Sequence, residues 1–150
     1  MQIGILTKDL NNSQVNYDII NTLNSASDSH SVCVMYRDIS LNFRSLSFPV
    51  FNYVKAYNTY FDNNSLLIAT DIESSLCIKN IKNASRKIFY VYELEFIRDK
   101  NFDRNYNAFI GIELLTRSQS YSDVIHNYCG ITPKISPLNI ESIIKVLCLY

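Results

Sequence analysis

The residues best suited to chemistry stand in short polar corners that directly follow apolar segments. Arg117 and Ser118 follow an apolar run that ends at Thr116, and Tyr121 comes about one helical turn later. An arginine beside the free N–H groups at the start of a helix can bind a phosphate or a carboxylate. The same residues also suit a structural role, in which Ser118 caps the helix and Arg117 faces solvent. Because Ser118 lacks the Gly-x-Ser-x-Gly pattern of a hydrolase, we expect no nucleophilic catalysis from it.

Acidic side chains follow two further apolar segments. Asp71 comes after the apolar run 66–69, where it can bind a hydroxylated ligand, act as a base, or cap the next helix. Glu93 lies near the end of the run 86–94 (RKIFYVYEL), and Glu95 follows two residues later. On a strand this spacing places two carboxylates on one face, about 7 Å apart. Such a pair could perform acid–base chemistry or simply be solvated.

The first apolar segment, 2–7 (QIGILT), leads into a corner that contains no glycine. A dinucleotide-binding loop (GxGxxG) or a phosphate-binding loop (GxxxxGK[ST]) would carry glycines there, so that the backbone could approach a pyrophosphate. We therefore expect no NAD, FAD or ATP binding and no cofactor. Thr7 and Asp9 are candidates for binding another polar ligand at this corner. Gly4, inside the segment, predicts the close approach of a neighbouring backbone.

Length and composition predict one globular domain over residues 1–150. The 14 basic residues equal the 14 acidic ones, and this balance argues against nucleic-acid binding. The four cysteines are far apart and lack the spacing of zinc ligands, so we expect no metal and reduced thiols. Without a run of about 20 apolar residues, we expect no membrane span and a soluble, cytoplasmic protein. The abundance of Asn, Ile and Tyr is typical of AT-rich genomes, including those of viruses and phages.

Apolar strand patterns alternate with helical patterns along the chain. We expect helices with one apolar face from about Ser13, which can cap the first of them, after Asp71, over 121–128 and from Ile140. A short helix is expected over 50–61. Residues 95–107 are predicted to form a charged loop. About six strands are predicted, at 2–7, 31–36, 66–69, 86–94, 107–115 and 131–136. Strands separated by helices predict an α/β fold: a single doubly wound, mainly parallel, Rossmann-like sheet with helices on both faces.

The segment LLTRSQSYSDVIHNYCGITPKIS (114–136) resembles the amino-terminal domain of GT-B glycosyltransferases. In that family a strand that ends in a small polar residue precedes a helix that finishes at Tyr-x-Gly, before a short strand. The matching residues here are Arg117-Ser118 and Tyr128 to Gly130. The segments KIFYVYELEF and MQIGILTKDL resemble two other strands of the family, and the first of them places Glu93 toward the cleft. The glycine-containing loop that many members carry after the first strand is missing.

The resemblance implies a ligand-binding role rather than a complete enzyme. GT-B enzymes pair two Rossmann-like domains, and the second, which mostly holds the sugar-nucleotide donor, has no counterpart in this sequence. We therefore expect a domain that is not catalytic alone and that binds a sugar, a sugar nucleotide or a protein partner at the carboxyl edge of its sheet. One alternative is a glycosyltransferase subunit completed by a second chain or by homodimerisation. Another is a viral or phage-type interaction module, with Tyr53, Tyr57 and Tyr60 exposed to a protein partner.

Overall fold

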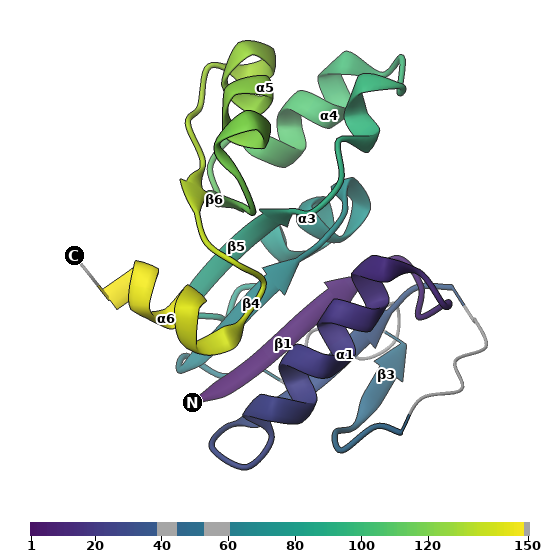
Figure 1. Ribbon diagram of the computed structural model, residues 1–150, viewed down its shortest axis with the longest axis vertical. Coiled ribbons are helices and arrows are strands. Elements are labelled where there is room, and N and C mark those ends of the chain that lie inside the picture. Colours follow the sequence, from purple (N-terminus) through teal and green to yellow (C-terminus); the bar gives the residue numbers. More distant parts are fainter. Residues whose placement is uncertain (39–44, 53–60, 149–150) are drawn as a thin grey trace.

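The computed structural model describes residues 1–38, 45–52 and 61–148, and in them seven parallel strands form one sheet (Figure 1). Helices flank the sheet on both faces. Across the sheet the order is β3-β2-β1-β4-β5-β6-β7. The strands are β1 (Gln2–Thr7), β2 (Ser31–Tyr36), β3 (Val50–Asn52), β4 (Ser65–Ala69), β5 (Arg86–Val91), β6 (Glu113–Thr116) and β7 (Lys134–Ile135). The helices are α1 (Gln14–Ala26), α3 (Ile72–Lys79), α4 (Phe102–Phe109), α5 (Gln119–Cys129) and α6 (Ile140–Cys148), with a short 3-10 helix, η1 (Glu95–Ile97).

Two separate apolar layers hold the helices on the sheet. Alternate strand side chains such as Ile5 pack with α1 and α6, whose Ile19 and Ile143 are fully buried. The opposite side chains, such as Leu67, pack with α3, α4 and α5. Since β4 is buried at every residue, both of its faces are covered, as expected for a parallel sheet with helices on each side. The fold is therefore the predicted doubly wound, Rossmann-like α/β domain.

The order of the strands defines one special position at the carboxyl edge. From β1 the chain moves outward through β2 to β3, and it then returns to β4 on the other side of β1. The connections that leave β1 and β4 therefore diverge to opposite faces of the sheet. In open α/β sheets, ligands bind in the crevice outside such a switch point. Thr7, at the end of β1, and Asp71, just after β4, both lie at this switch point.

The edge strand β3 corrects one sequence prediction. Residues 50–61 were expected to form a short helix, yet Val50–Asn52 pairs with Val34–Tyr36 of β2 as an outer parallel strand. Aromatic and β-branched residues favour an extended backbone when a partner strand is available, and this tertiary pairing prevails over the near-helical spacing. Residues 53–60, with Tyr53, Tyr57 and Tyr60, lie outside the described residues.

A second correction concerns the segment before β6. Residues 95–107 are not a continuous charged loop, because they contain η1 and most of α4. The strand predicted over 107–115 is confined to Glu113–Thr116. Ala108 and Phe109 belong instead to the buried face of α4. Gly111, which has a φ of 68°, turns the chain between the helix and the strand and divides the apolar run in two.

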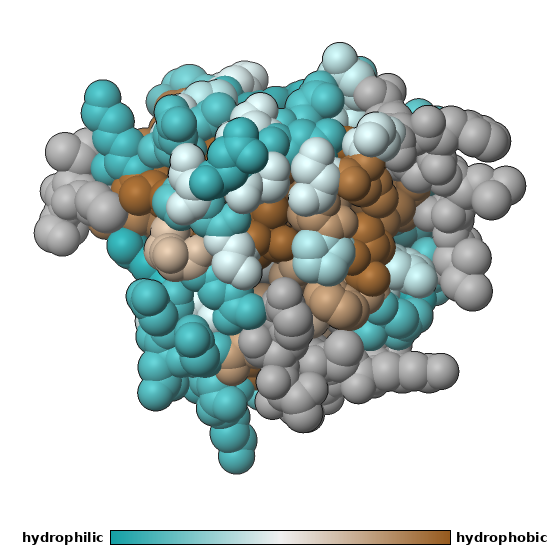
Figure 2. All heavy atoms as spheres, turned by 90° about the horizontal axis from the view of Figure 1, so that it is seen from below, coloured by the Kyte–Doolittle hydropathy of each residue, from teal (hydrophilic) through white to brown (hydrophobic). Residues whose placement is uncertain are grey.

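One face of the molecule carries both polar and apolar side chains. Figure 2 shows this face, with an apolar patch near the middle of the view and hydrophilic side chains above it and to its left. Apolar atoms make up a large share of any folded protein's surface, and we assign no site to this face. No helix in the described part of the chain is both long and apolar enough to cross a membrane.

Candidate functional site

Polar side chains converge on a cleft outside the switch point. One cavity of about 210 Å³ lies over the ends of β1 and β4, and a neighbouring cavity of about 170 Å³ continues toward α4. Both are lined by Lys8, Asp71 and Glu95, so we treat them as one feature, the switch-point cleft. Thr7, Asp9 and Glu93, three further residues singled out from the sequence, also line it.

Asp71 occupies the centre of the cleft and caps α3. Its Oδ1 accepts a hydrogen bond from the Ser74 N–H at 2.9 Å, and Ser74 Oγ accepts one from the Asp71 N–H at 3.1 Å. The capping role predicted as one alternative is therefore confirmed. The other carboxylate oxygen, Oδ2, is buried and has no hydrogen-bond partner among the described residues. Burial raises the pKa of Asp71, although the Ser74 bonds and the nearby Lys8 N–H oppose this shift.

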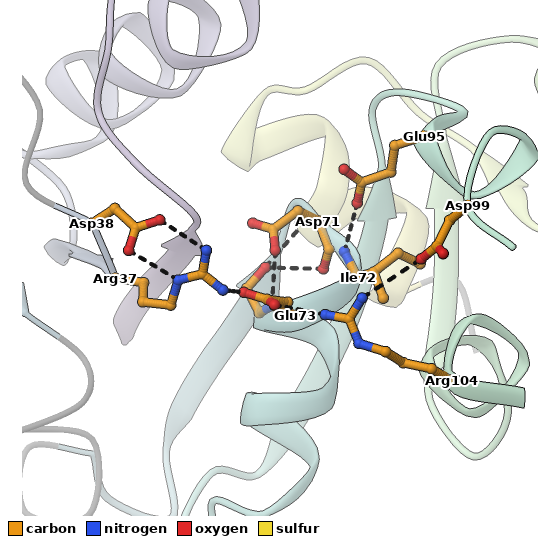
Figure 3. A network of polar contacts seen from close by, with 9 residues as sticks. Arg37, Asp38, Asp71, Ile72, Glu73, Glu95, Asp99 and Arg104 are labelled. Atoms are coloured by element: carbon orange, nitrogen blue, oxygen red, sulfur yellow. Dashed lines mark hydrogen bonds and ion pairs between the residues drawn. The ribbon is translucent and has the colours of Figure 1, made fainter. Parts of the chain in front are cut away.

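Glu95 places a second carboxylate at the same helix start. Its Oε1 accepts a hydrogen bond from the Ile72 N–H at 2.9 Å, as Figure 3 shows. The side chain is exposed overall, but its carboxylate is partly covered by the first turn of α3. Desolvation raises the pKa of Glu95, and the negative charge of Asp71 adds to the shift. Two acids with raised pKa values thus share one helix N-terminus, which itself favours negative charge.

A chain of ion pairs forms the wall of the cleft on the α4 side (Figure 3). Glu73 pairs with Arg37, which follows β2, and with Arg104 of α4, whose Nη2 lies 2.7 Å from Glu73 Oε1. Arg37 also pairs with Asp38 at 2.8 Å, and Arg104 approaches Asp99 at 3.6 Å. Because these groups are partly solvated, the two pairs of Glu73 each contribute less than about 1 kcal/mol to stability. Their main effect is to link three elements around the cleft.

A carboxylate lies at the start of α1, where many Rossmann-like proteins bind phosphate. Asp9 Oδ1 accepts hydrogen bonds from the Asn11 N–H and from Asn16 Nδ2, both at 3.1 Å. Ser13 caps the helix, as predicted. The larger cavity is thus lined by one cation and four carboxylates, those of Asp9, Asp71, Glu93 and Glu95. This charge balance repels phosphate, which supports the expectation drawn from the glycine-free corner.

Glu93 and Glu95 meet in the cleft, but not in the predicted way. The strand β5 ends at Val91, and Glu95 begins the 3-10 helix η1, so the two carboxylates do not share a strand face. The chain leaves the sheet after Val91, and the next residue, Tyr92, is buried between α1 and the β6 corner. Glu93 is left exposed, and its side chain lines the larger cavity.

Arg117, Ser118 and Tyr121 lie at the β6–α5 corner, outside the switch-point cleft. Ser118 caps α5, with its Oγ accepting from the Tyr121 N–H at 3.4 Å, and Gly130 ends the helix with a φ of 77°. These two local predictions are confirmed. Arg117 does not simply face solvent: its Nη2 donates to the Tyr121 hydroxyl at 2.6 Å, and its guanidinium lies over the Tyr92 ring. Arg117 lines a separate pocket together with Tyr92.

Other reactive side chains do not form a site in the described residues. No group of three or more His, Cys, Asp and Glu side chains there could hold a metal ion. Cys33, Cys77 and Cys129 are free thiols, and burial raises the pKa of Cys33 to about 12, which keeps it protonated. Comparison with protein-family models, curated proteins and solved structures gave no match. The candidate site is therefore defined by its geometry and chemistry.

The raised pKa values of Asp71 and Glu95 predict a pH effect on stability. The folded protein binds these two protons more tightly than the unfolded chain, so lowering the pH favours the fold. This contribution should grow as the pH falls through the raised pKa values and level off below the usual ones, 3.8 for Asp71 and 4.5 for Glu95. Urea unfolding of D71N, which can keep the cap, should show a smaller gain on acidification than the wild type.

The control for this measurement is Asp28→Asn. Asp28 is exposed in the turn after α1, so its substitution should leave the pH profile of the wild type unchanged. A D71N profile with the same slope as the wild type would contradict the assigned burial of the Asp71 charge.

Proposed function

We propose that the switch-point cleft binds a small polyhydroxylated ligand of the sugar class. The observation that carries the proposal is the convergence of Lys8, Asp71, Glu93 and Glu95 on one cleft at the switch point. Sugar hydroxyl groups donate hydrogen bonds to carboxylates and accept them from an ammonium group, so they match this lining. The excess of carboxylates favours a ligand whose part inside the cleft carries no negative charge.

The sequence resemblance supports the same class of ligand. The segment 114–136 and the strand that leads to Glu93 resemble parts of GT-B amino-terminal domains. A domain of that kind would hold an acceptor-like sugar at the carboxyl edge of its sheet. The proposal concerns binding alone. Sugar transfer with a second chain would also need a sugar-nucleotide donor, and the carboxylates of this cleft disfavour the diphosphate of such a donor.

Binding of cellobiose and glucose, followed by backbone amide NMR shifts, tests the proposal. We expect shifts that saturate at millimolar sugar and that centre on Lys8, Asp71, Glu93 and Glu95. Shifts spread evenly over the surface, or none at all with either sugar, would overturn it.

Glu93→Gln is the variant that probes the cleft without disturbing the fold. Glu93 is exposed, and removing its charge weakens the hydrogen bonds that it accepts from sugar hydroxyls. We expect its affinity for cellobiose to fall about tenfold, a free-energy change of about 1.4 kcal/mol. The matched variant Asp28→Asn, which removes an exposed acid far from the cleft, should bind cellobiose like the wild type. Equal affinities for all three proteins would remove Glu93 from the site.

A further inference from the structure

A second pocket lies beside the switch-point cleft, on the α1 side of the carboxyl edge. Its volume is about 360 Å³, and its chemistry differs from that of the cleft. Pro137 and Leu138 supply apolar surface, Asn21 and Thr22 of α1 supply polar groups, and Arg117 supplies a cation. Tyr92 lines both the pocket and the cleft, so the two cavities are neighbours.

Arg117 is held in a fixed orientation at this pocket. The centre of its guanidinium lies 4.9 Å from the centroid of the Tyr92 ring and 4.6 Å from that of Tyr121. Its Nη2 donates to the Tyr121 hydroxyl, which fixes the rotation of the planar group. Cation–π contacts of this kind orient an arginine without using its other N–H donors. Within the described residues the guanidinium donates only to Tyr121, so its other donors can form the paired hydrogen bonds that a carboxylate or a phosphate accepts.

Arg117 is also not paired with an acid: among the described residues no carboxylate forms an ion pair with it. The one acid that lines the pocket, Asp18, keeps its charge but does not bond Arg117: its oxygens accept from Gln14 Nε2 at 2.9 Å and from the Tyr92 hydroxyl. The pocket therefore presents an arginine whose charge is not neutralised by a bonded acid, whereas the neighbouring cleft is rich in carboxylates.

The start of α5 adds to this preference. Arg117 immediately precedes Ser118, the cap of a helix of 11 residues; no residue of α5 lines the pocket, so the helix acts on it only through its dipole. The positive end of the helix dipole strengthens an anion contact here. The helix alone would not define a site, but here it acts beside an oriented guanidinium and a pocket.

We propose that Arg117 binds the acidic group, a carboxylate or a phosphate, of an acidic saccharide whose sugar ring occupies the switch-point cleft. This inference rests on the proposed function and narrows its ligand. The sugar ring contacts Lys8, Asp71 and Glu93, and the acidic group passes Tyr92 to reach Arg117. Such a ligand places its negative charge away from the carboxylates of the cleft and against the arginine.

Three matched disaccharides test the inference by calorimetry and amide NMR: cellobiose, cellobiouronic acid and cellobiose 6′-phosphate. The acidic pair differs from cellobiose only at one carbon and tells carboxylate from phosphate. We expect at least one acidic disaccharide to bind about tenfold more tightly than cellobiose, with added shifts at Arg117 and Tyr121. If cellobiose binds and neither acidic form binds more tightly, the inference is overturned while the proposed function stands. If none of the three binds, the proposed function fails as well.

Substitutions at Arg117 locate the effect. Arg117→Gln should reduce the affinity for the acidic disaccharide to that for cellobiose and leave cellobiose binding unchanged. Arg117→Lys keeps the charge but loses the planar donor pair, so it should retain only part of the preference. Lys82→Gln, which removes an exposed cation after the end of α3, is the control and should keep the full preference. A loss of binding that is equal for neutral and acidic sugars in R117Q would assign Arg117 a structural role and overturn the inference.

Discussion

Phe109→Ala is expected to lower the free energy of unfolding by about 3–5 kcal/mol. Phe109 is fully buried at the end of α4 and packs among three other rings. Its ring centroid lies 5.3 Å from that of Phe89 and 5.0 Å from that of Phe96. Tyr128 of α5 completes the cluster at 5.9 Å. Truncation to alanine would leave a cavity between the sheet and two helices, which cannot close without moving them.

The same substitution should also weaken ligand binding, because it loosens the wall of the cleft. Phe96 packs against Phe109 and follows Glu95, whose carboxylate meets the start of α3. A cavity behind Phe96 lets this part of the wall shift, so F109A should bind cellobiose more weakly even when it is fully folded. Urea unfolding measures the stability change, and calorimetry below the unfolding transition measures the change in binding.

Phe102→Ala is the matched control, since it removes an aromatic ring from the same helix. Phe102 is 52% exposed; its ring stacks on Tyr106 at the surface and meets the outer side of the cluster at Tyr128, 5.2 Å between ring centroids. We expect it to lose less than about 1 kcal/mol of stability. A larger loss for F102A than for F109A would show that the aromatic cluster is not packed as described.

Much of the fold follows from local sequence signals. Capping was predicted for Ser13 and was one of the alternatives for Asp71 and Ser118, because these side chains can bond the backbone three residues later, and each one does. Such signals act over a single turn, so no tertiary information is needed to read them. The apolar runs predicted most strands for a similar reason: a parallel strand buried on both faces is continuous in its hydrophobicity.

The errors fall where a tertiary contact decides between two local possibilities. The segment 50–61 carries aromatics at near-helical spacing, and only its pairing with β2 makes Val50–Asn52 a strand. In NAFIGIELL the apolar residues run on without a break, and the turn at Gly111 separates a helix from a strand. A glycine in such a run was the one available signal of this division.

The sequence predicted where the candidate site lies, at the carboxyl edge of the sheet, but only some of the residues that form it. Asp71 was found because it follows the end of a buried strand, and the carboxyl ends of parallel strands meet at one edge. Arg37 follows 31–36 in the same way, so the same rule could have found it. Its bond to Glu73 joins residues that are distant in sequence, and no local pattern encodes it. The contact between Arg117 and Tyr92 is likewise a consequence of the sheet.

Gly4→Ala is expected to lower the free energy of unfolding by about 1–3 kcal/mol, through overpacking rather than loss of contacts. A Cβ atom at Gly4 would lie 2.5 Å from Cζ of Phe61 and 3.0 Å from Cδ2 of Leu67. The sequence predicted the approach of a backbone here; the nearest atoms are instead those of a side-chain ring. Phe61 is buried, with 4% of its surface exposed, so the ring cannot simply turn out into solvent.

A second substitution distinguishes this clash from a general effect on β1. Phe61→Leu shortens the side chain and makes room for the added methyl group. The loss of stability in the double variant should therefore be smaller than the sum of the two single losses, which a double-mutant cycle in urea measures. Strictly additive losses would show that Phe61 does not limit the space at Gly4. Gly4 lies inside the sheet and does not line the cleft, which the same strand reaches only at Thr7. Folded G4A should therefore bind cellobiose with wild-type affinity, so that the substitution lowers stability without changing the site.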